Sequence, residues 1–294
     1  MKPIYLMLLF FCFSAVQTQS RPRFSFALAA DMRNFTGDRT EYFRGVCESV
    51  STHKDISFMI SPGDIDPPDS VYYTIQKYLN ANMIWYPVVG NHEAETASDM
   101  EWLRNYNKGG LLLPNIVNAG PASCRETNYS FDYKNTHFVI LNQYSKENCD
   151  NCTKGDMPDF LYYWLKDDLQ KTKMKNILVI GHEPAYPLPD IENQRFRHID
   201  DCLNQYPENR DRFVKLLQDY KVKAYIYGHT HNYIVAKLNK LWHVDVGHSR
   251  GKGDPGARST YLIMTVEGDQ ISYSTYRLNG KTNSYEIADN AILD

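Results

Sequence analysis

The sequence predicts a layered α/β fold. Three observations support this fold class. Strand-like and helix-like segments alternate between residues 24 and 89, four apolar strand-like runs end in a glycine followed by polar residues, and the chain becomes rich in strand patterns after residue 233. An alternating order of strands and helices favours parallel strands whose carboxyl ends share one edge of a sheet, which is where ligands bind in such folds.

The first third of the chain carries the alternation most clearly. Largely apolar runs predict buried strands at residues 24–30, 56–60 and 84–89. Between them, residues 40–50 and 71–79 repeat apolar side chains at helical spacing. A period of about 3.6 residues indicates a helix, whereas a short unbroken apolar run bounded by turn residues indicates a buried strand. The predicted order is therefore strand, helix, strand, helix, strand.

The remainder of the chain continues with strands and two further helices. A long connection at residues 184–209 separates two of these elements, and connections of that length often shape a site. Asn279-Gly280 predicts a hairpin turn before a last short strand. The predicted strands are 128–133, 137–142, 177–180, 223–227, 233–238, 241–246, 260–266 and 270–276, and the predicted helices are 159–169 and 211–220.

The composition is that of an ordinary globular protein. The chain has 294 residues, of which 43% are hydrophobic and 23% charged, with a formal net charge of −3. This charge argues against a nucleic-acid-binding surface. No internal repeat, low-complexity segment or linker interrupts residues 21–294, so we expect them to form a single domain.

The N-terminus has the pattern of a secretory signal peptide. Lys2 precedes an apolar run from Ile4 to Val16, and the small residues Thr18 and Ser20 fit a cleavage site after residue 20. An uncleaved membrane anchor is the alternative. We expect removal of residues 1–20 and a protein that is secreted, or periplasmic in a bacterium, without stable insertion in a membrane.

The predicted export leads us to expect disulfides between cysteines and, in a eukaryote, glycosylated asparagines. The five cysteines beyond the signal segment predict two disulfides and one odd thiol, and a structural disulfide within the Cys-x-x-Cys sequence is one of the pairings. These cysteines are Cys47, Cys124, Cys149, Cys152 and Cys202. In a eukaryote, three triplets would be glycosylation acceptors. They begin at Asn34, Asn128 and Asn151.

Metal-ligand residue types follow five of the predicted strands. Because these strand ends are expected to meet at one edge, the residues should form one centre. Carboxylates and imidazoles with one amide oxygen suit Zn, Fe or Mn better than Ca, which prefers oxygen alone. The combination predicts a hydrolytic metal centre. Its candidate residues are Asp31, Asp64, Asn91 with His92, His182, and His229 with His231.

This ordered series resembles the calcineurin-like metallophosphoesterase superfamily, in particular the branch of purple acid phosphatases and cyclic-nucleotide phosphodiesterases. The resemblance covers residues 24 to about 276. It implies a four-layer α-β-β-α sandwich, with two mixed sheets and two metal ions at the carboxyl ends of the strands. The motifs that carry it are Asp31, Gly63-Asp64, Gly90-Asn91-His92-Glu93, Gly181-His182 and Gly228-His229-Thr230-His231.

The resemblance also implies a role for each of these residues. Two divalent or trivalent ions neutralise phosphate oxygens and activate a hydroxide that attacks phosphorus, while His92 protonates the leaving group. Asp64 is expected to bridge the ions. One ion is then completed by Asn91, His182 and His229, and the other by Asp31 and His231.

The first two motifs depart from the family pattern. Asp31-Met32-Arg33 lacks the histidine that the family places at the third position, and Pro67 stands where purple acid phosphatases have their metal-binding tyrosine. One ion is therefore expected to retain three protein ligands, and a purple iron centre is not expected. Arg33 is either a catalytic residue that pairs with the substrate phosphate beside this ion, or a residue that neutralises Asp31 or caps a loop.

The segment at residues 248–253 adds two candidate substrate-binding residues, His248 and Arg250. A flexible glycine-rich turn is the alternative interpretation of this segment.

The leading functional hypothesis is a secreted phosphatase that releases phosphate from small-molecule monoesters. A phosphodiesterase acting on cyclic nucleotides or lipid head groups is one alternative. A secreted pseudo-enzyme with a depleted metal site, acting as a binding protein, is the other.

Overall fold

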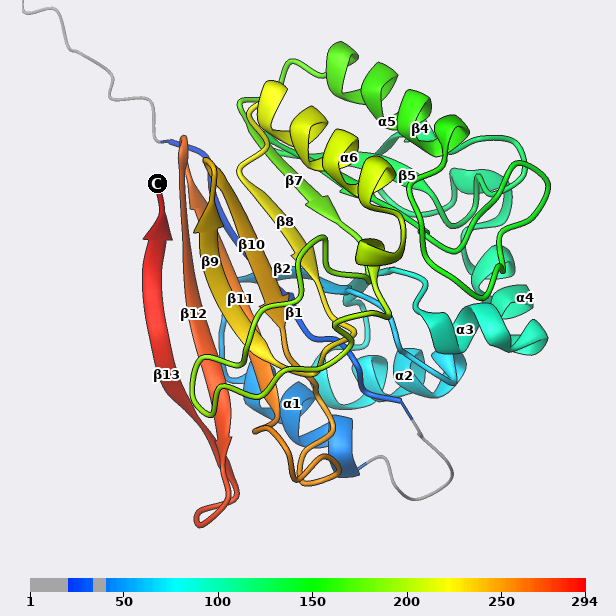
Figure 1. The fold of residues 1–294 in the computed structure, drawn as a ribbon. Helices are drawn as coiled ribbons and strands as arrows, with labels where there is room; N and C mark the ends of the chain where they lie inside the picture. The colour runs from blue at the N-terminus through cyan, green and yellow to red at the C-terminus, as the bar shows by residue number, and fades with distance from the viewer. Residues whose placement is uncertain (1–20, 34–40) are drawn as a thin grey trace, which may run out of the picture.

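Two stacked β-sheets form the centre of the molecule, and helices cover both outer faces (Figure 1). The computed structural model describes residues 21–33 and 41–294. The predicted signal peptide, the Asn34 triplet and the predicted helix start at residue 40 therefore lie outside the described residues. This arrangement confirms the predicted α/β sandwich of two mixed sheets.

The first sheet has six strands in the order β13-β12-β11-β1-β2-β3. β1, β2 and β3 are parallel neighbours, so their carboxyl ends lie at one edge. The other three strands pair antiparallel and continue the sheet beyond β1, in the order β11, β12 and β13. The strand bounds are β1 (Arg23–Leu28), β2 (Ile56–Ser61), β3 (Ile84–Pro87), β11 (Thr260–Glu267), β12 (Gln270–Asn279) and β13 (Ser284–Leu293).

The second sheet has seven strands in the order β4-β5-β6-β7-β8-β10-β9. Its central strands β6, β7, β8 and β10 are parallel, and the flanking strands are antiparallel. The strand bounds are β4 (Ile116–Ala119), β5 (Tyr129–Tyr133), β6 (Thr136–Ile140), β7 (Asn176–Ile180), β8 (Ala224–Tyr227), β9 (Tyr233–Leu238) and β10 (Leu241–Val246).

The helices form the two outer layers. One apolar cluster joins the helices α1, α2 and α4 to the outer face of the first sheet, and another joins α5 and α6 to the second. Figure 1 shows α5 and α6 side by side over β7 and β8. The bounds are α1 (Glu41–Ser51), α2 (Pro68–Thr74) continued by the π-helical turn η2 (Ile75–Leu79), α3 (Asn91–Glu95), α4 (Ala97–Tyr106), α5 (Asp159–Lys171) and α6 (Pro207–Asp219), with short 3₁₀ turns η3 (Lys108–Gly110) and η4 (Leu203–Gln205).

Aromatic side chains fill the space between the sheets. Phe26 and Phe58 of the first sheet pack edge-on against Phe138 of the second, with ring centroids 5.3 and 5.4 Å apart. Tyr86 of β3 stacks on Phe131 of β5 at 3.8 Å. Such pairs contribute about 0.5–1.5 kcal/mol each beyond their buried area. The apolar runs that predicted buried strands therefore hold the two sheets together, and with them the edges that carry the site.

Three elements were not predicted, and one strand is longer than expected. α3 and α4 occupy a polar stretch whose buried apolar side chains are sparse, and β4 is a partly exposed strand at the edge of its sheet. β13 extends over ten residues although most of its side chains are exposed. In these segments backbone pairing or short-range packing determines the structure. Hydrophobic periodicity is weak there, so it does not predict a helix or a strand.

The predicted disulfides are absent from the described residues, where all five cysteines are free thiols. Cys47 packs in the helical layer outside the first sheet, whereas Cys202 is buried beside the cluster outside the second. Residues on opposite outer faces cannot be bridged, which removes one of the possible pairings. Cys149 and Cys152 lie in one loop, and both are free thiols, so the structure does not contain the predicted disulfide within the Cys-x-x-Cys sequence.

Of the predicted glycosylation triplets, the one at Asn128 is ruled out by burial. The Asn128 side chain is fully buried and bonds to the backbone N–H of Asn142 and the hydroxyl of Ser145. Asn151 is exposed, so the prediction there is unaffected. Among residues 21–33 and 41–294, no helix combines the length and apolar character that crossing a membrane requires.

Candidate metal centre

The predicted ligands from the two sheets meet at one edge of the sandwich. Asp31 and Asp64 follow β1 and β2 of the first sheet, whereas His182 and the His229/His231 pair follow β7 and β8 of the second. His182 Nε2 lies 3.3 Å from Asp64 Oδ1, and His231 Nε2 lies 3.6 Å from Asp31 Oδ1. His229 Nδ1 lies 3.2 Å from His182 Nε2. The structure thus brings these five residues into a single cluster.

Four of the clustered residues have left-handed backbone conformations. The φ angles are 53° at Asp31, 52° at Asp64, 71° at His229 and 58° at His231. Such conformations cost of order 1 kcal/mol or more each for residues other than glycine, and they persist where the surrounding structure imposes them. Their concentration at one edge indicates that the loops are shaped to aim these side chains inward.

Two glycines allow the ligand loops to approach one another. A Cβ atom at Gly90 would overlap the backbone and carboxylate of Asp64, and one at Gly228 would overlap the Asp31 carboxylate. Any larger residue at either position would push a carboxylate away. Glycine at these two positions therefore lets the ligand loops lie in direct contact.

Each clustered histidine has one ring nitrogen occupied outside the cluster. His182 Nδ1–H donates to the carbonyl of Pro62 at 2.8 Å, and His231 Nδ1–H to Asp254 Oδ2 at 2.7 Å. His229 Nε2–H donates to a backbone carbonyl, that of Asp201, at 2.6 Å. These bonds orient the rings so that the lone pairs of the other nitrogens face inward, the arrangement found for histidines that bind metals.

The pKa values of the clustered carboxylates and imidazoles favour a bound cation. Burial and the neighbouring Asp64 charge raise the pKa of Asp31, and burial raises the pKa of Asp64 to about 6. Burial lowers the pKa of His182 to about 4 and that of His231 to about 3. The imidazoles are therefore neutral at pH 7, and the buried carboxylates are left without a cationic partner among them. A bound cation would favour the ionised carboxylates and these neutral rings.

Two further observations fit a metal centre. The lone pairs of His182 Nε2 and His229 Nδ1 face each other across 3.2 Å, a repulsive arrangement unless a cation or proton lies between them. Asn91 Oδ1 is buried and has no hydrogen-bond partner within the described part of the chain. Buried amide oxygens are rarely left unpaired, so this atom is available as a ligand. The donor set of carboxylates, imidazoles and one amide oxygen thus fits the implied ions.

Three ligand atoms on the Asp31 side could bind one ion. Asp31, Asp64 and His231 each offer an atom within 4.8 Å of the other two. This is the three-residue set that the sequence predicted for the ion whose usual histidine is missing. Three protein ligands leave positions open for water or substrate.

A second group of three, His198, Asp201 and His229, meets the same 4.8 Å criterion. The sequence suggested no special role for His198, because no partner residue stands at a regular spacing from it. In the structure its ring centroid lies 4.1 Å from that of His229. It reaches this position from the long connection between β7 and α6, where periodicity gives no guide to tertiary contacts.

Other residues behind the cluster were also missed by sequence reasoning. Glu93 accepts bonds from the backbone N–H groups of Asp64 and Gly90, at 3.1 and 2.7 Å. Gln143 Oε1 accepts from the N–H of His182 at 2.8 Å. Glu93 is the last residue of the Gly90-Asn91-His92-Glu93 motif, so its place in the motif was the available signal. Gln143 and Asp254 have no such signal, because only the fold brings their loops to the site.

His92 and Arg33 lie together at the rim of the cluster. His92 is about one quarter exposed, and its Nε2 lies 3.6 Å from Asp64 Oδ2. Arg33 Nη1 contacts the same ring nitrogen of His92. Of the two interpretations of Arg33, direct pairing with Asp31 has no contact to support it among the described residues. The guanidinium instead contacts His92 at the rim of the cluster.

The two candidate substrate-binding residues of the 248–253 segment occupy different positions. His248 is fully buried, its Nε2–H donates to the carbonyl of Ala257 at 3.0 Å, and its Nδ1 accepts from the N–H of Arg250. Its ring lies 5.7 Å from that of His231, so it packs behind this ligand and does not face the opening. The turn at residues 251–256 folds back over it. Arg250 is partly exposed.

Comparisons with known proteins agree with this geometry. The family model described as calcineurin-like phosphoesterase matches residues 25–233. Purple acid phosphatase 22 of Arabidopsis thaliana is 23% identical over 219 residues, which cover 71% of this chain and 44% of that protein. The chain therefore spans less than half the length of this curated relative.

Solved structures with the same fold include PhoD and GAP50, the latter described as the anchor in the inner membrane complex of Plasmodium. PhoD has a TM-score of 0.59 at 12% identity, covering 92% of this chain and 72% of that chain. GAP50 has a TM-score of 0.56 at 16% identity, covering 92% and 88%. At such identities the likeness establishes the fold.

Proposed function

Because the chain belongs to the calcineurin-like phosphoesterase family, we propose that it is a metal-dependent hydrolase of small phosphate monoesters. The observation that supports this most is the convergence of Asp31, Asp64 and His231 with His182 and His229 at one edge of the sandwich. In the proposed activity, bound cations neutralise the phosphate oxygens and lower the pKa of water.

The proposed ligand assignment follows the positions of the side chains. Asp64 lies between the two groups, 3.3 Å from His182 and within 4.8 Å of the Asp31 and His231 ligand atoms, which suits a bridging carboxylate. His182 and His229 would hold one ion together with the free amide oxygen of Asn91. Zn, Fe and Mn are the proposed metals, because each accepts nitrogen and oxygen ligands.

The proposed proton donor is His92. Its ring is partly exposed at the mouth of the cluster, so a leaving-group oxygen can reach it without displacing a buried ligand. Its Nε2 lies 3.6 Å from Asp64 Oδ2 and also contacts Arg33, so the ring is held beside the proposed ions. Proton donation by a positioned histidine accelerates such reactions by about 10²–10⁴-fold.

The assay that tests the proposal compares two chromogenic esters on the metal-loaded protein. We expect p-nitrophenyl phosphate to be hydrolysed faster than bis(p-nitrophenyl) phosphate. Faster cleavage of the bis ester would favour a phosphodiesterase instead. If neither ester is cleaved by protein that contains both ions, the chain is a binding protein and the proposed activity is wrong.

We also propose that the protein is exported. Lys2 and the apolar run from Ile4 to Val16 support this proposal. Expression of the full chain in cells of a suitable host, followed by N-terminal sequencing of the secreted product, is expected to find Arg21 as the first residue. Retention of the full-length chain inside the cells would contradict it.

A further inference from the structure

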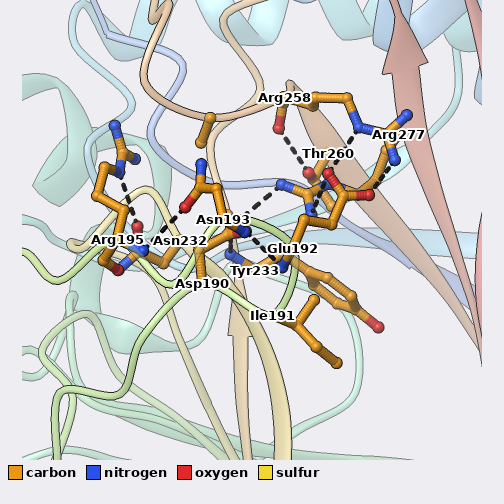
Figure 2. Close-up of polar contacts among 12 residues, drawn as sticks. Asp190, Ile191, Glu192, Asn193, Arg195, Asn232, Tyr233, Arg258, Thr260 and Arg277 are labelled. Carbon is orange, nitrogen blue, oxygen red and sulfur yellow. Dashed lines mark hydrogen bonds and ion pairs between the residues drawn. The ribbon is translucent and has the colours of Figure 1, made fainter.

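The long connection between β7 and α6 is fastened to both sheets by a buried ion pair. Asp190 and Arg277 are almost completely buried, and Asp190 Oδ2 lies 3.1 Å from Arg277 Nη2 of β12. The same oxygen accepts the backbone N–H of Tyr233 in β9 at 2.9 Å. Figure 2 shows these contacts, through which Asp190 joins the connection to β12 and β9. An ionised and hydrogen-bonded pair of this kind holds the chain that follows it in a defined position.

The first arginine after this anchor is fully engaged in structural contacts. Arg195 Nε donates to Asn232 Oδ1 at 3.0 Å, and Nη2 donates to the carbonyl of His231 at 3.3 Å. Its Nη1 reaches Asp254 Oδ1 at 3.3 Å. All three nitrogens of this guanidinium therefore have protein partners, so Arg195 supports the backbone and the partner carboxylate of His231.

Arg197, two residues after Arg195, makes fewer hydrogen bonds to the protein. Among the described residues, its one hydrogen bond runs from Nη1 to Asp254 Oδ2 at 3.4 Å, and its side chain is 32% exposed. A guanidinium offers five N–H donors in a planar fork. Most of these donors are open to a ligand that enters from solvent.

The position of Arg197 is set on two sides by residues of the metal centre. Asp254 Oδ2, which it contacts, lies 2.7 Å from His231 Nδ1. The ring of the next residue, His198, lies against that of His229, with centroids 4.1 Å apart and the planes tilted by 40°. Arg197 therefore lies over the His229/His231 motif, and the Asp31 carboxylate attracts it.

The local charge leaves Arg197 incompletely neutralised. Asp254 already accepts hydrogen bonds from His231, Arg195 and the backbone N–H of Gly256, so with Arg197 it is shared among four donors. Burial lowers the pKa of Arg197, the Asp254 and Asp31 carboxylates raise it, and the nearby cations Arg195 and Arg250 lower it. A cation in such surroundings gains from an added anion, and its planar fork matches two oxygens of a phosphoryl group.

We propose that Arg197 binds a non-bridging oxygen of the substrate's phosphoryl group and makes the site selective for monoesters over diesters. This inference rests on the proposed function and specifies its substrate class. A monoester presents a dianionic phosphoryl group, whereas a diester replaces one anionic oxygen by an ester oxygen and carries a single charge. The added arginine therefore stabilises the bound monoester more than the bound diester.

The test measures binding of inorganic phosphate to the metal-loaded protein by titration calorimetry. Arg197→Gln is expected to raise the Kd for phosphate about tenfold to a hundredfold, the effect of one charge-assisted hydrogen bond. Arg197→Lys, which keeps the charge but not the fork, should give an intermediate Kd. Metal content should stay at the wild-type value in both variants.

Arg212→Gln is the matched control. Arg212 is 31% exposed and pairs with Asp159, away from the metal centre. This control should leave the phosphate Kd within about twofold of wild type, since it removes one charge without touching the site. A phosphate Kd within twofold of wild type in Arg197→Gln, with full metal content, would overturn the inference. So would an absence of phosphate binding in the wild type.

Hydrolysis separates this inference from the proposed function. If the wild type cleaves both esters, Arg197→Gln should lower kcat/KM for p-nitrophenyl phosphate at least fivefold more than for the bis ester. Equal losses on the two esters would contradict the selectivity. If the wild type cleaves neither ester but Arg197→Gln still weakens phosphate binding, the proposed activity fails while Arg197 remains an anion-binding residue.

Discussion

At the scale of single residues, the histidine at the rim can be tested separately from the histidines inside. His92 is the most exposed histidine of the motifs, whereas His182 and His231 are buried and hydrogen-bonded from behind. Their surroundings predict different defects on substitution. A rim residue should affect turnover, and a buried ligand should affect metal binding.

Replacing His92 by Ala should lower kcat for p-nitrophenyl phosphate by about 10²–10⁴-fold, because the leaving group loses its proton donor. Metal content should be unchanged, since His92 is not among the assigned ligands. Steady-state kinetics with elemental analysis of the same preparation checks both statements. Turnover within about threefold of wild type would refute the assigned role.

Replacing Asp254 by Asn should weaken metal binding about 10–100-fold, the usual effect of losing the carboxylate partner of a ligand histidine. Asp254 accepts the Nδ1–H of His231 at 2.7 Å and so fixes which nitrogen faces the centre. Equilibrium dialysis against Zn²⁺ measures the change. Asp269→Asn is the control, because Asp269 makes only an exposed pair with Lys175; an equal loss in both variants would refute the positioning role.

At the scale of elements, buried ionic contacts tie helices and loops to the sheets. His137 of β6 lies between Asp132 of β5 and Asp168 of α5, with distances of 2.7 and 2.8 Å. The Asp190–Arg277 pair joins the long connection to β12. Both contacts lie outside the metal centre, so they can be tested through stability alone.

The His137 contact predicts a loss of stability at alkaline pH. Burial opposes the protonated ring, but the hydrogen bonds and charges of Asp132 and Asp168 outweigh it and raise the pKa of His137 to about 9. A raised pKa in the folded state stabilises fully below the unfolded value of about 6.5, and the stabilisation disappears as pH rises through 9. It amounts to about 3 kcal/mol at most.

Urea unfolding between pH 6.5 and 9 measures this effect. The free energy of unfolding of the wild type should fall by more than that of His137→Gln, which lacks the titrating ring. His53→Gln, at a half-buried histidine that packs edge-on against Tyr276, is the control and should retain the wild-type slope. Parallel curves for wild type and His137→Gln would contradict the assignment.

Breaking the Asp190–Arg277 pair should be costly. Arg277→Met leaves the Asp190 carboxylate buried without its cation, which typically destabilises by about 3–5 kcal/mol. The double variant Asp190→Asn with Arg277→Met should recover part of this loss, because no unpaired charge remains. Chemical denaturation of the three proteins tests both steps. A double variant less stable than Arg277→Met would indicate that Asp190 stabilises the fold independently of Arg277.

At the scale of the whole molecule, the fold and the inner ligands were predictable for one reason. Asp31, Asp64 and His182 follow largely apolar runs, and such runs become parallel strands whose carboxyl ends share an edge. The sequence alone could therefore place these ligands together. The pairing of two sheets came from the resemblance to a known family, since periodicity does not say which strands join which sheet.

The supporting residues could not be predicted in the same way. Asp254, Gln143 and His198 lie in loops without periodicity, and each reaches the centre only because the fold returns its loop to the same edge. His248 illustrates the opposite error. It follows a strand as the ligands do, but the turn after it closes over the ring and buries it.

The central claim is that residues from both sheets surround two ions at one edge of the sandwich. Anomalous diffraction at the metal absorption edge, from crystals grown with the bound metal, tests it most directly. We expect two anomalous peaks, one among Asp31, Asp64 and His231, and one beside Asp64, His182 and His229. Metal-supplied crystals without anomalous density at either position, or with density only elsewhere, would contradict the account.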